Sequence, residues 1–435
     1  MKITCEQLAR QLESEIGVTA VEIAGEKLAN HTVAARKPAV LCIPDAAEKL
    51  ATALRLCDAA EAAVIPWGGG TAMAVGNPPR QCDVVIALNR LSRLLEHDDA
   101  NLTTTVEAGM SLAQLQGITA RQNQFAPFDP PHAERATIGG IVAANLNGPR
   151  RMSHGSVRDL VTGMKMTLAS GKQIKAGGKV VKNVAGYDMC KLFVGSLGTL
   201  GIVTEVTLRV APVPERAATL IGCGTLSQVL RVSEQISRSP LLPAAVVILK
   251  LEANEMARHS LQQWAIAVCT EGFTESVSRH LDDLKNIAVR NGLNADTLES
   301  DAHRRFWGTI RDFPLMPDRL VYRLTLPRAS VLGLEKAWQN WQISEGSPAL
   351  IADAAAGTVW ISVAAQLSAG AWFSKLISFA RDSGGHAVMF AAPANLKQGV
   401  DVWGSPPTAL PLMREVKRQF DPKDLLNPGR FVSGI

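Results

Sequence analysis

Three glycine-rich segments, far apart in the sequence, constrain the fold more than any other feature of this chain. They are Gly68-Gly69-Gly70-Thr71, Thr137-Ile138-Gly139-Gly140 and a run from Gly195 to Ile202. Consecutive glycines tolerate positive φ and have no Cβ, so the backbone N–H groups can wrap around the oxygens of a diphosphate. Each segment alone is more often a tight turn. Together, in this order, they indicate one large, flat ligand that carries phosphate.

The pattern around the first glycine segment places it at the end of a strand. Residues 63–65 form a short apolar run that follows a helical pattern, and the glycines come directly after it. Further strands are expected at residues 84–88 and 103–108, a hairpin over 157–179, and an alternating strand over 202–210. Ligands of open α/β sheets bind at strand ends of this kind. The first half is therefore expected to mix parallel and antiparallel strands around a ligand site.

The character of the sequence changes after Pro214. Apolar strand patterns alternate with amphipathic helical patterns up to residue 383. Such a pattern predicts an α+β unit, a separate antiparallel sheet with helices on one face.

The charge balance and the cysteines exclude several classes of function. The 45 basic and 40 acidic residues are interleaved without a long basic run, so we expect neither nucleic acid nor an anionic membrane surface as a partner. The seven cysteines contain no CxxC pair, which favours reduced thiols and argues against an iron–sulfur cluster or cysteine zinc site on this chain. The first residues contain no apolar signal region, and no later window is long enough to span a membrane. We therefore expect a cytoplasmic protein.

Several motifs resemble the FAD-binding domain shared by vanillyl-alcohol oxidase (VAO), p-cresol methylhydroxylase (PCMH) and the D-lactate and glycolate dehydrogenases. These motifs are PWGGGT, TIGGIVAANLNGPRRMSHGSVRDLV, GGKVVKNVAGYDMCKLFVGSLGTLGIVTEVTLRVAP and the terminal FDPKDLLNPGRF. The PPH at residues 130–132, GPRR at 148–151, KNVAGYD at 182–188 and GGHA at 384–387 resemble most closely the FAD-binding subunits E of bacterial glycolate oxidases. The resemblance spans nearly the whole chain and is densest over residues 127–212.

The resemblance implies a two-lobed VAO/PCMH-type FAD-binding domain at residues 1–213 and an α+β cap at 214–395. A C-terminal segment, 396–435, would return to the FAD domain. The implied cofactor-binding residues are Pro66, Trp67, Gly68, Gly69, Gly70 and Thr71 at the diphosphate, Thr137, Gly139, Gly140 and Ala143 at the diphosphate and ring, and Ile202 at the adenine side. The first glycine segment has no histidine or cysteine, which favours noncovalent FAD. His132 and His154 leave covalent attachment open.

Oxidation of a 2-hydroxy acid by hydride transfer to a flavin requires a cationic clamp for the carboxylate and a base for the hydroxyl proton. The resemblance to D-2-hydroxy acid dehydrogenases implies two such elements in the cap, an arginine after a tryptophan and a metal-binding HxGDGNxH. Here Arg311 matches the arginine, with Arg323 as a helper, and an ion-paired or solvated Arg311 is the alternative. His386 matches the first histidine, but AVMFAAPA follows it, so we expect no metal. His386 is a candidate base, and a structural histidine is the stronger alternative.

The first hypothesis is an FAD-carrying subunit of a glycolate oxidase complex. A homologous catalytic flavin subunit and an iron–sulfur subunit would be its partners, and they could hold it at the inner face of the membrane. The second is a self-sufficient FAD-dependent dehydrogenase for glycolate or D-lactate, with His386 or His132 as base. The third is a noncatalytic assembly subunit.

Overall fold

A computed structural model describes residues 4–179, 187–261, 264–341, 348–365 and 369–435. The KNVAGYD motif lies mostly outside these residues. The chain divides into two compact units. Residues 1–147, 156–212 and 397–435 form the first unit, and residues 148–155 and 213–396 form the second.

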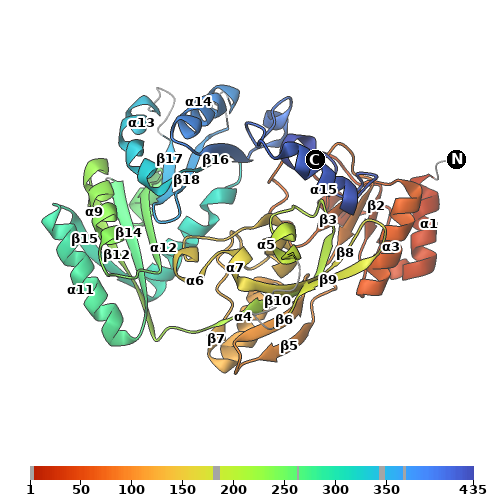
Figure 1. The fold of residues 1–435 in the computed structure, drawn as a ribbon, viewed down its shortest axis with the longest axis horizontal. Coiled ribbons are helices and arrows are strands. Elements are labelled where there is room, and N and C mark those ends of the chain that lie inside the picture. Colours follow the sequence, from red (N-terminus) through yellow and green to blue (C-terminus); the bar gives the residue numbers. More distant parts are fainter. Residues whose placement is uncertain (1–3, 180–186, 262–263, 342–347, 366–368) are drawn as a thin grey trace. The chain divides into compact units, whose positions relative to one another are not determined.

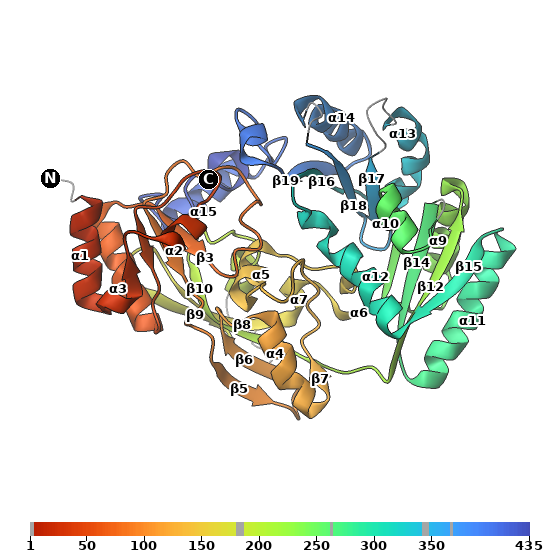
Figure 2. The ribbon, with the colours of Figure 1, turned by 180° about the vertical axis from the view of Figure 1, so that it is seen from behind.

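The N-terminal lobe of the first unit is a four-stranded sheet with helices on both faces, α1 and α3 on one and α2 on the other (Figure 2). Its strand order is β1-β2-β4-β3, and β4 pairs in parallel with both β2 and β3. Leu12 and Leu54 pack with Val84 on one face, while Leu28 packs with Val85 on the other. The elements are α1 (Cys5–Ile16), β1 (Val21–Glu22), α2 (Glu26–Asn30), β2 (Val40–Cys42), α3 (Ala47–Ala60), β3 (Val64–Trp67) and β4 (Val84–Ala87).

The second lobe of the first unit is a five-stranded antiparallel sheet of order β5-β6-β10-β8-β9. Its core includes Val106, Met166 and Val206 from the sheet and Ile141 from the helix α5. The strands are β5 (Leu94–Asp98), β6 (Thr103–Glu107), β8 (Val161–Thr167), β9 (Gln173–Gly177) and β10 (Ile202–Arg209), beside a small pair β7 (Gln124–Phe125) and β11 (Ala211–Pro212). The helices are α4 (Leu112–Thr119), α5 (Ile138–Ala144), α7 (Val157–Leu160) and α8 (Met189–Phe193).

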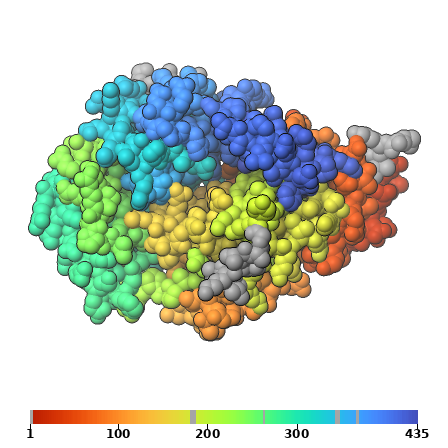
Figure 3. All heavy atoms as spheres, viewed as in Figure 1, coloured from red at the N-terminus to blue at the C-terminus, as the bar shows by residue number. Residues whose placement is uncertain are grey.

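The C-terminal segment belongs to the first unit and lies against its N-terminal lobe. Its helix α15 (Leu410–Phe420) precedes a short extended stretch in which Leu426 bridges in parallel to Val64 of β3. On the outside, Lys423 bonds to the carboxylate of Asp58 at 3.0 Å. Figure 3 shows this segment in dark blue on the visible surface, next to the orange and red atoms of the N-terminal lobe.

The second unit is built on an eight-stranded sheet in which every described pairing is antiparallel. The strand order is β15-β12-β14-β13-β17-β18-β16-β19. The strands are β12 (Arg216–Gly224), β13 (Ala245–Lys250), β14 (Trp264–Gly272), β15 (Asn294–Glu299), β16 (Arg319–Thr325), β17 (Ala349–Asp353), β18 (Thr358–Ala364) and β19 (His386–Ala391). The helices are α6 (Arg151–His154), α9 (Leu226–Arg238), α10 (Ala253–Arg258), α11 (Thr274–Arg290), α12 (Ser300–Asp312), α13 (Leu334–Trp341) and α14 (Ala369–Asp382).

The two faces of this sheet differ in their cover. Figures 1 and 2 agree in placing α9 and α11 on one side of the strands and α12 on the other. On the α12 face, Phe306 and Ile310 pack on Val247 and Ile351. Arg323 of β16 pairs with Trp360, which packs on the α12 face. Because side chains alternate along a strand, the adjacent Tyr322 points to the opposite face, where its hydroxyl donates to the Ala369 carbonyl of α14 at 3.0 Å.

The predicted α+β class, with mixed strands in the first half and an antiparallel sheet in the second, is confirmed. The expectation that helices cover only one face of that sheet is wrong, because α12 packs on the face opposite α9 and α11. One expected strand is wrong at its start, because residues 157–160 form the helix α7 before β8 begins. Ser156 and Asp159 form a capping box that stabilises this turn of helix. No helix of the described chain is long and apolar enough to cross a membrane.

Candidate functional site

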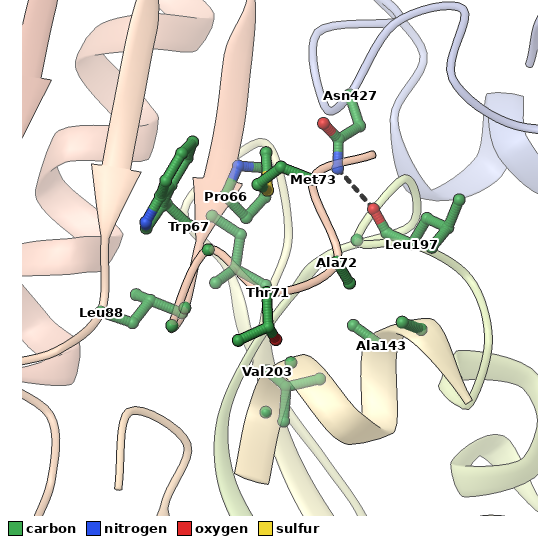
Figure 4. Close-up of a pocket in the computed structure, with 18 of the residues that line it drawn as sticks. Pro66, Trp67, Thr71, Ala72, Met73, Leu88, Ala143, Leu197, Val203 and Asn427 are labelled. Carbon is green, nitrogen blue, oxygen red and sulfur yellow. Dashed lines mark hydrogen bonds between the residues drawn. The ribbon is translucent and has the colours of Figure 1, made fainter. Parts of the chain in front are cut away.

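The three glycine-rich segments meet at one pocket of the first unit (Figure 4). The first segment follows β3, the second forms the start of α5, and the third leads into β10. The structure therefore brings together residues that lie far apart in the sequence. The predicted cofactor-binding residues that line this pocket are Pro66, Trp67, Gly68, Gly69, Gly70, Thr71, Gly139, Gly140, Ala143 and Ile202. Thr137 lies directly behind the first segment, beside Gly68.

Close packing of the first two segments requires glycine at two positions. A Cβ on Gly68 would overlap the hydroxyl oxygen of Thr137, and a Cβ on Gly69 would overlap the carbonyl oxygen of Arg135. Thr137 is fixed in turn as the N-cap of α5, where its hydroxyl accepts a hydrogen bond from the N–H of Gly140 at 3.3 Å. Chain packing alone therefore accounts for these two glycines, and ligand binding must be argued from the pocket.

The pocket offers hydrogen-bond donors on an apolar background. Within the described chain, no residue accepts a hydrogen bond from the backbone N–H groups of Gly68, Gly69, Gly70 or Thr71. These residues are half-buried, and four consecutive N–H groups that point from them into a pocket wall suit the oxygens of a ligand. Leu88, Leu197 and Val203 supply apolar surface at the same wall. This combination suits a flat ligand with a phosphate group.

Asn427 and Arg430, from the C-terminal segment, also line this pocket. Neither residue was expected at the site, although both lie in the FDPKDLLNPGRF motif. The family resemblance of that motif was the available signal. Its local pattern gave no indication that it reaches the first glycine segment.

In the second unit, the predicted clamp Arg311 and its predicted helper Arg323 lie on different elements. Nε of Arg311, on α12, lies 3.2 Å from a carboxylate oxygen of Asp312, so the ion-paired alternative describes this residue. Arg323, on β16, lies on the α12 face beside the paired rings of Trp360 and Phe390, with its guanidinium carbon 5.9 and 5.3 Å from the two ring centres. Its Nε is buried and has no hydrogen-bond partner among the described residues. Burial and the charge of Arg151 lower the pKa of Arg323 to about 10.

His386 begins β19 and pairs in register with Thr325, two residues after Arg323 on the neighbouring strand. Although His386 keeps solvent contact, partial burial of its imidazole and the charge of Arg323 lower its pKa. The imidazole is therefore neutral at neutral pH and able to accept a proton. Of the two arginines, the structure therefore places the predicted helper, Arg323, near His386.

The segment at residues 148–155 adds two more arginines to the second unit, where the sequence gave only a family motif. Arg150 bonds to the Glu271 carboxylate at 2.8 Å, and His154 lies 3.5 Å from it. Burial of Glu271 opposes its ionisation, but the hydrogen bond from His154 and the charge of Arg150 lower its pKa to about 2. Arg151 donates to the Thr358 hydroxyl at 3.0 Å.

Arg151 also faces Asp353, with Nε 3.8 Å from a carboxylate oxygen. Burial nevertheless raises the pKa of Asp353 to about 6. The acids of this face are therefore matched by Arg150 and Arg151, whereas Arg323 has no acid partner in the described chain. Across the described ranges, no group of three or more His, Cys, Asp or Glu side chains is placed to hold a metal ion.

Comparisons with known proteins place this pocket in a family. A model described as "FAD binding domain" matches residues 38–177, and one described as "FAD linked oxidases, C-terminal domain" matches residues 405–431. Glycolate oxidase subunit GlcE of Escherichia coli is 31% identical over 79% of this chain and 85% of its own length. Glycolate oxidase subunit GlcD of Bacillus subtilis is 26% identical over 91% of this chain and 89% of its own. D-lactate dehydrogenase of Archaeoglobus fulgidus is 26% identical over 90% of this chain and 91% of its own length.

Solved structures share the fold at low identity. p-Cresol methylhydroxylase superposes with a TM-score of 0.76 at 14% identity, over 98% of this chain and 96% of that one. Alkyldihydroxyacetonephosphate synthase superposes with a TM-score of 0.73 at 17% identity, over 97% of this chain and 86% of that one. At these identities the likeness shows the fold alone. The pocket of the first unit therefore lies in a fold shared with p-cresol methylhydroxylase.

Proposed function

We propose a function from one premise: the chain belongs to the family of FAD-linked oxidoreductases with a PCMH-type FAD-binding domain, which includes glycolate oxidase subunits. FAD is its cofactor, and it is an FAD-dependent oxidoreductase. Within this family we assign it the role of an FAD-carrying subunit in a complex that oxidises glycolate. A homologous catalytic flavin subunit and an iron–sulfur subunit would be its partners. The name of the relative at 31% identity, a subunit, supports this finer assignment.

The pocket at the three glycine segments is the observation that carries the proposal. The N–H groups of residues 68–71 and the hydroxyl of Thr71 would hold the diphosphate, and Gly139, Gly140 and Ala143 would lie along the cofactor. The described lining contains no histidine or cysteine, which supports noncovalent binding. When bound, the flavin supplies a two-electron acceptor.

The second unit favours a second candidate function, a dehydrogenase that oxidises its own 2-hydroxy acid. Arg323 is a half-buried cation, with a buried Nε, that has no acid partner in the described chain, so a substrate carboxylate would complete its charge balance. His386, neutral and close to Arg323, would take the hydroxyl proton on an imidazole nitrogen. Arg311 is a weaker clamp because Asp312 already balances it.

Visible spectra of the purified chain, recorded before and after anaerobic addition of glycolate, separate these functions. The subunit proposal expects a yellow chain that keeps its flavin through gel filtration and is not bleached by glycolate until the partner subunits are added. Bleaching of the chain alone would replace that proposal by the self-sufficient dehydrogenase. A folded, colourless chain that takes up no added FAD would refute both and would support an assembly subunit.

A further inference from the structure

Two polar side chains of the C-terminal segment are buried at the wall of the glycine-segment pocket. Asn427 and Arg430 are only 3% and 4% exposed, and both line this pocket. The backbone fixes them there, because the N–H of Asn427 donates to the carbonyl of Val64 in β3 at 2.9 Å. The N–H of Arg430 then donates to the Asn427 carbonyl at 3.2 Å, which closes a turn. The segment is therefore held at β3 independently of its side chains.

Each of these side chains has one polar atom without a partner. Nδ2 of Asn427 donates to the carbonyl of Leu197, as Figure 4 shows, while its buried Oδ1 has no hydrogen-bond partner in the described chain. One terminal nitrogen of Arg430 donates to the carbonyls of Met73 and Val75 at 2.8 and 2.6 Å. Its buried Nε has no partner among the described residues. Buried polar atoms are normally satisfied, so an acceptor and a donor left open at one pocket point to a ligand.

The charge at this wall also lacks a counterpart. Lys397 donates to the carbonyls of Ala74 and Gly76, the second at 3.0 Å, so two buried cations hold the loop that follows the first glycine segment. No carboxylate of the described chain forms an ion pair with Lys397 or Arg430. Burial and the charge of Arg430 lower the pKa of Lys397 to about 7. Uncompensated buried charge is unfavourable, and an anionic ligand would relieve it.

We propose that Arg430 and Asn427 are cofactor-contacting residues: the Arg430 guanidinium is the charge partner of the FAD diphosphate, and Asn427 Oδ1 accepts a hydrogen bond from the same cofactor. A guanidinium donates to phosphate oxygens in a fixed fork, and carbonyl contacts with residues 73 and 75 hold it at the pocket that residues 68–71 also line. Lys397 acts through the loop and is a positioning residue. This inference rests on FAD binding in this pocket.

Comparison of FAD with riboflavin tests the charge contact, because riboflavin has the ring system and no phosphate. The flavin-free full chain is titrated with each compound, for the wild type and for Arg430→Met. We expect Arg430→Met to weaken FAD binding by about 10- to 100-fold, the range of a charge-assisted hydrogen bond, and to leave riboflavin binding within about twofold. Asn427→Ala should weaken FAD binding by about tenfold.

Arg80→Met is the matched control, because Arg80 pairs with Asp424 and donates to the Gly434 carbonyl at 2.8 Å, tethering the same segment from outside the pocket lining. Its FAD-to-riboflavin affinity ratio should equal that of the wild type. Equal losses for FAD and riboflavin in Arg430→Met would overturn the contact and leave a structural role. Unchanged FAD affinity in Asn427→Ala would remove that residue from the assignment.

If Arg430→Met does not fold, Arg430→Lys and the salt dependence of the wild type decide the question. Wild-type FAD affinity should fall with added salt while riboflavin affinity stays constant, and Arg430→Lys should keep part of the preference for FAD. A salt response that is the same for both compounds would contradict the proposal. A wild-type chain that binds neither compound would instead refute the FAD site itself.

Discussion

Replacement of Arg323 by methionine should stabilise the chain while it removes a binding function. The lowering of the Arg323 pKa to about 10 reports the unfavourable burial of its charge. At about 1.4 kcal/mol per pKa unit, this corresponds to about 3 kcal/mol of lost stability. The guanidinium is charged in both the folded and unfolded states at neutral pH, so the loss is present there. Methionine would remove the charge and also the contacts with the rings of Trp360 and Phe390, which contribute about 1 kcal/mol.

The net gain is therefore about 2 kcal/mol in the free energy of unfolding, or about 4 to 8 °C in Tm for a domain of this size. Thermal unfolding followed by tryptophan fluorescence measures it, with and without glycolate. We expect the wild type to be stabilised by glycolate through Arg323, and Arg323→Met to start from a higher Tm and lose that response. In a self-sufficient dehydrogenase, the apparent KM for glycolate would rise by about 10- to 100-fold.

Arg319 provides a matched control on the same strand and the same face. It pairs with Glu252, and its Nε donates to the Ser362 hydroxyl at 3.0 Å, so its charge is already balanced. Arg319→Met should lower Tm, because Glu252 would lose its partner. A lower Tm in Arg323→Met together with an intact glycolate response would refute the reasoning, since it would mean that the Arg323 charge is satisfied by the protein itself.

Three further predictions concern the glycine segment and two ionisable groups. Gly69→Ala should lose its flavin absorbance on gel filtration, because the new Cβ would overlap a backbone carbonyl, whereas Gly117→Ala, with open space around its Cβ, should keep it. The pKa of Glu271 is lowered to about 2 in the folded state. Its ionised form therefore adds to the free energy of unfolding above pH 4.5, and this stabilisation is lost as the pH falls toward 2. In urea unfolding, the free energy of unfolding of Glu271→Gln should fall less over that pH range than that of the wild type. The pKa of Lys397 is lowered to about 7 while the unfolded chain binds its proton up to pH 10.5, so flavin-free stability should rise with pH between these values. Lys397→Met should flatten that rise in the same assay.

The elements that the sequence predicted well have strong local signals. The alternating apolar pattern from residue 202 is β10, and the amphipathic run near residue 230 is α9. The glycine segments also carry a local signal. Their order along the chain matches the family resemblance, which predicted that all three line one pocket. By contrast, a strand was expected at residue 157, where the Ser156–Asp159 capping box outweighs the apolar pattern and begins a helix.

The parts that sequence reasoning missed depend on contacts between distant residues. Nothing in residues 148–155 indicates that Arg150 meets Glu271 on a strand of the second unit, because no periodicity encodes that pairing. Arg323 and His386 become neighbours only through the register of β16 with β19. For the same reason the preference for Arg311 over Arg323 rested on a motif, and the neighbouring Asp312 carboxylate is what the structure adds.

The contact of Arg430 with the loop at Met73 joins residues that are 357 positions apart in the chain. A ribosome that adds about 5 to 20 residues per second needs about 20 to 70 s to cover that interval. During this time the second unit is synthesised and its sheet can form. The pocket at the glycine segments still lacks the wall that the C-terminal segment provides. A chain that stops before Asn427 would therefore emerge with its second unit complete and its cofactor site open on one side, and we expect it to retain flavin less well than the full chain.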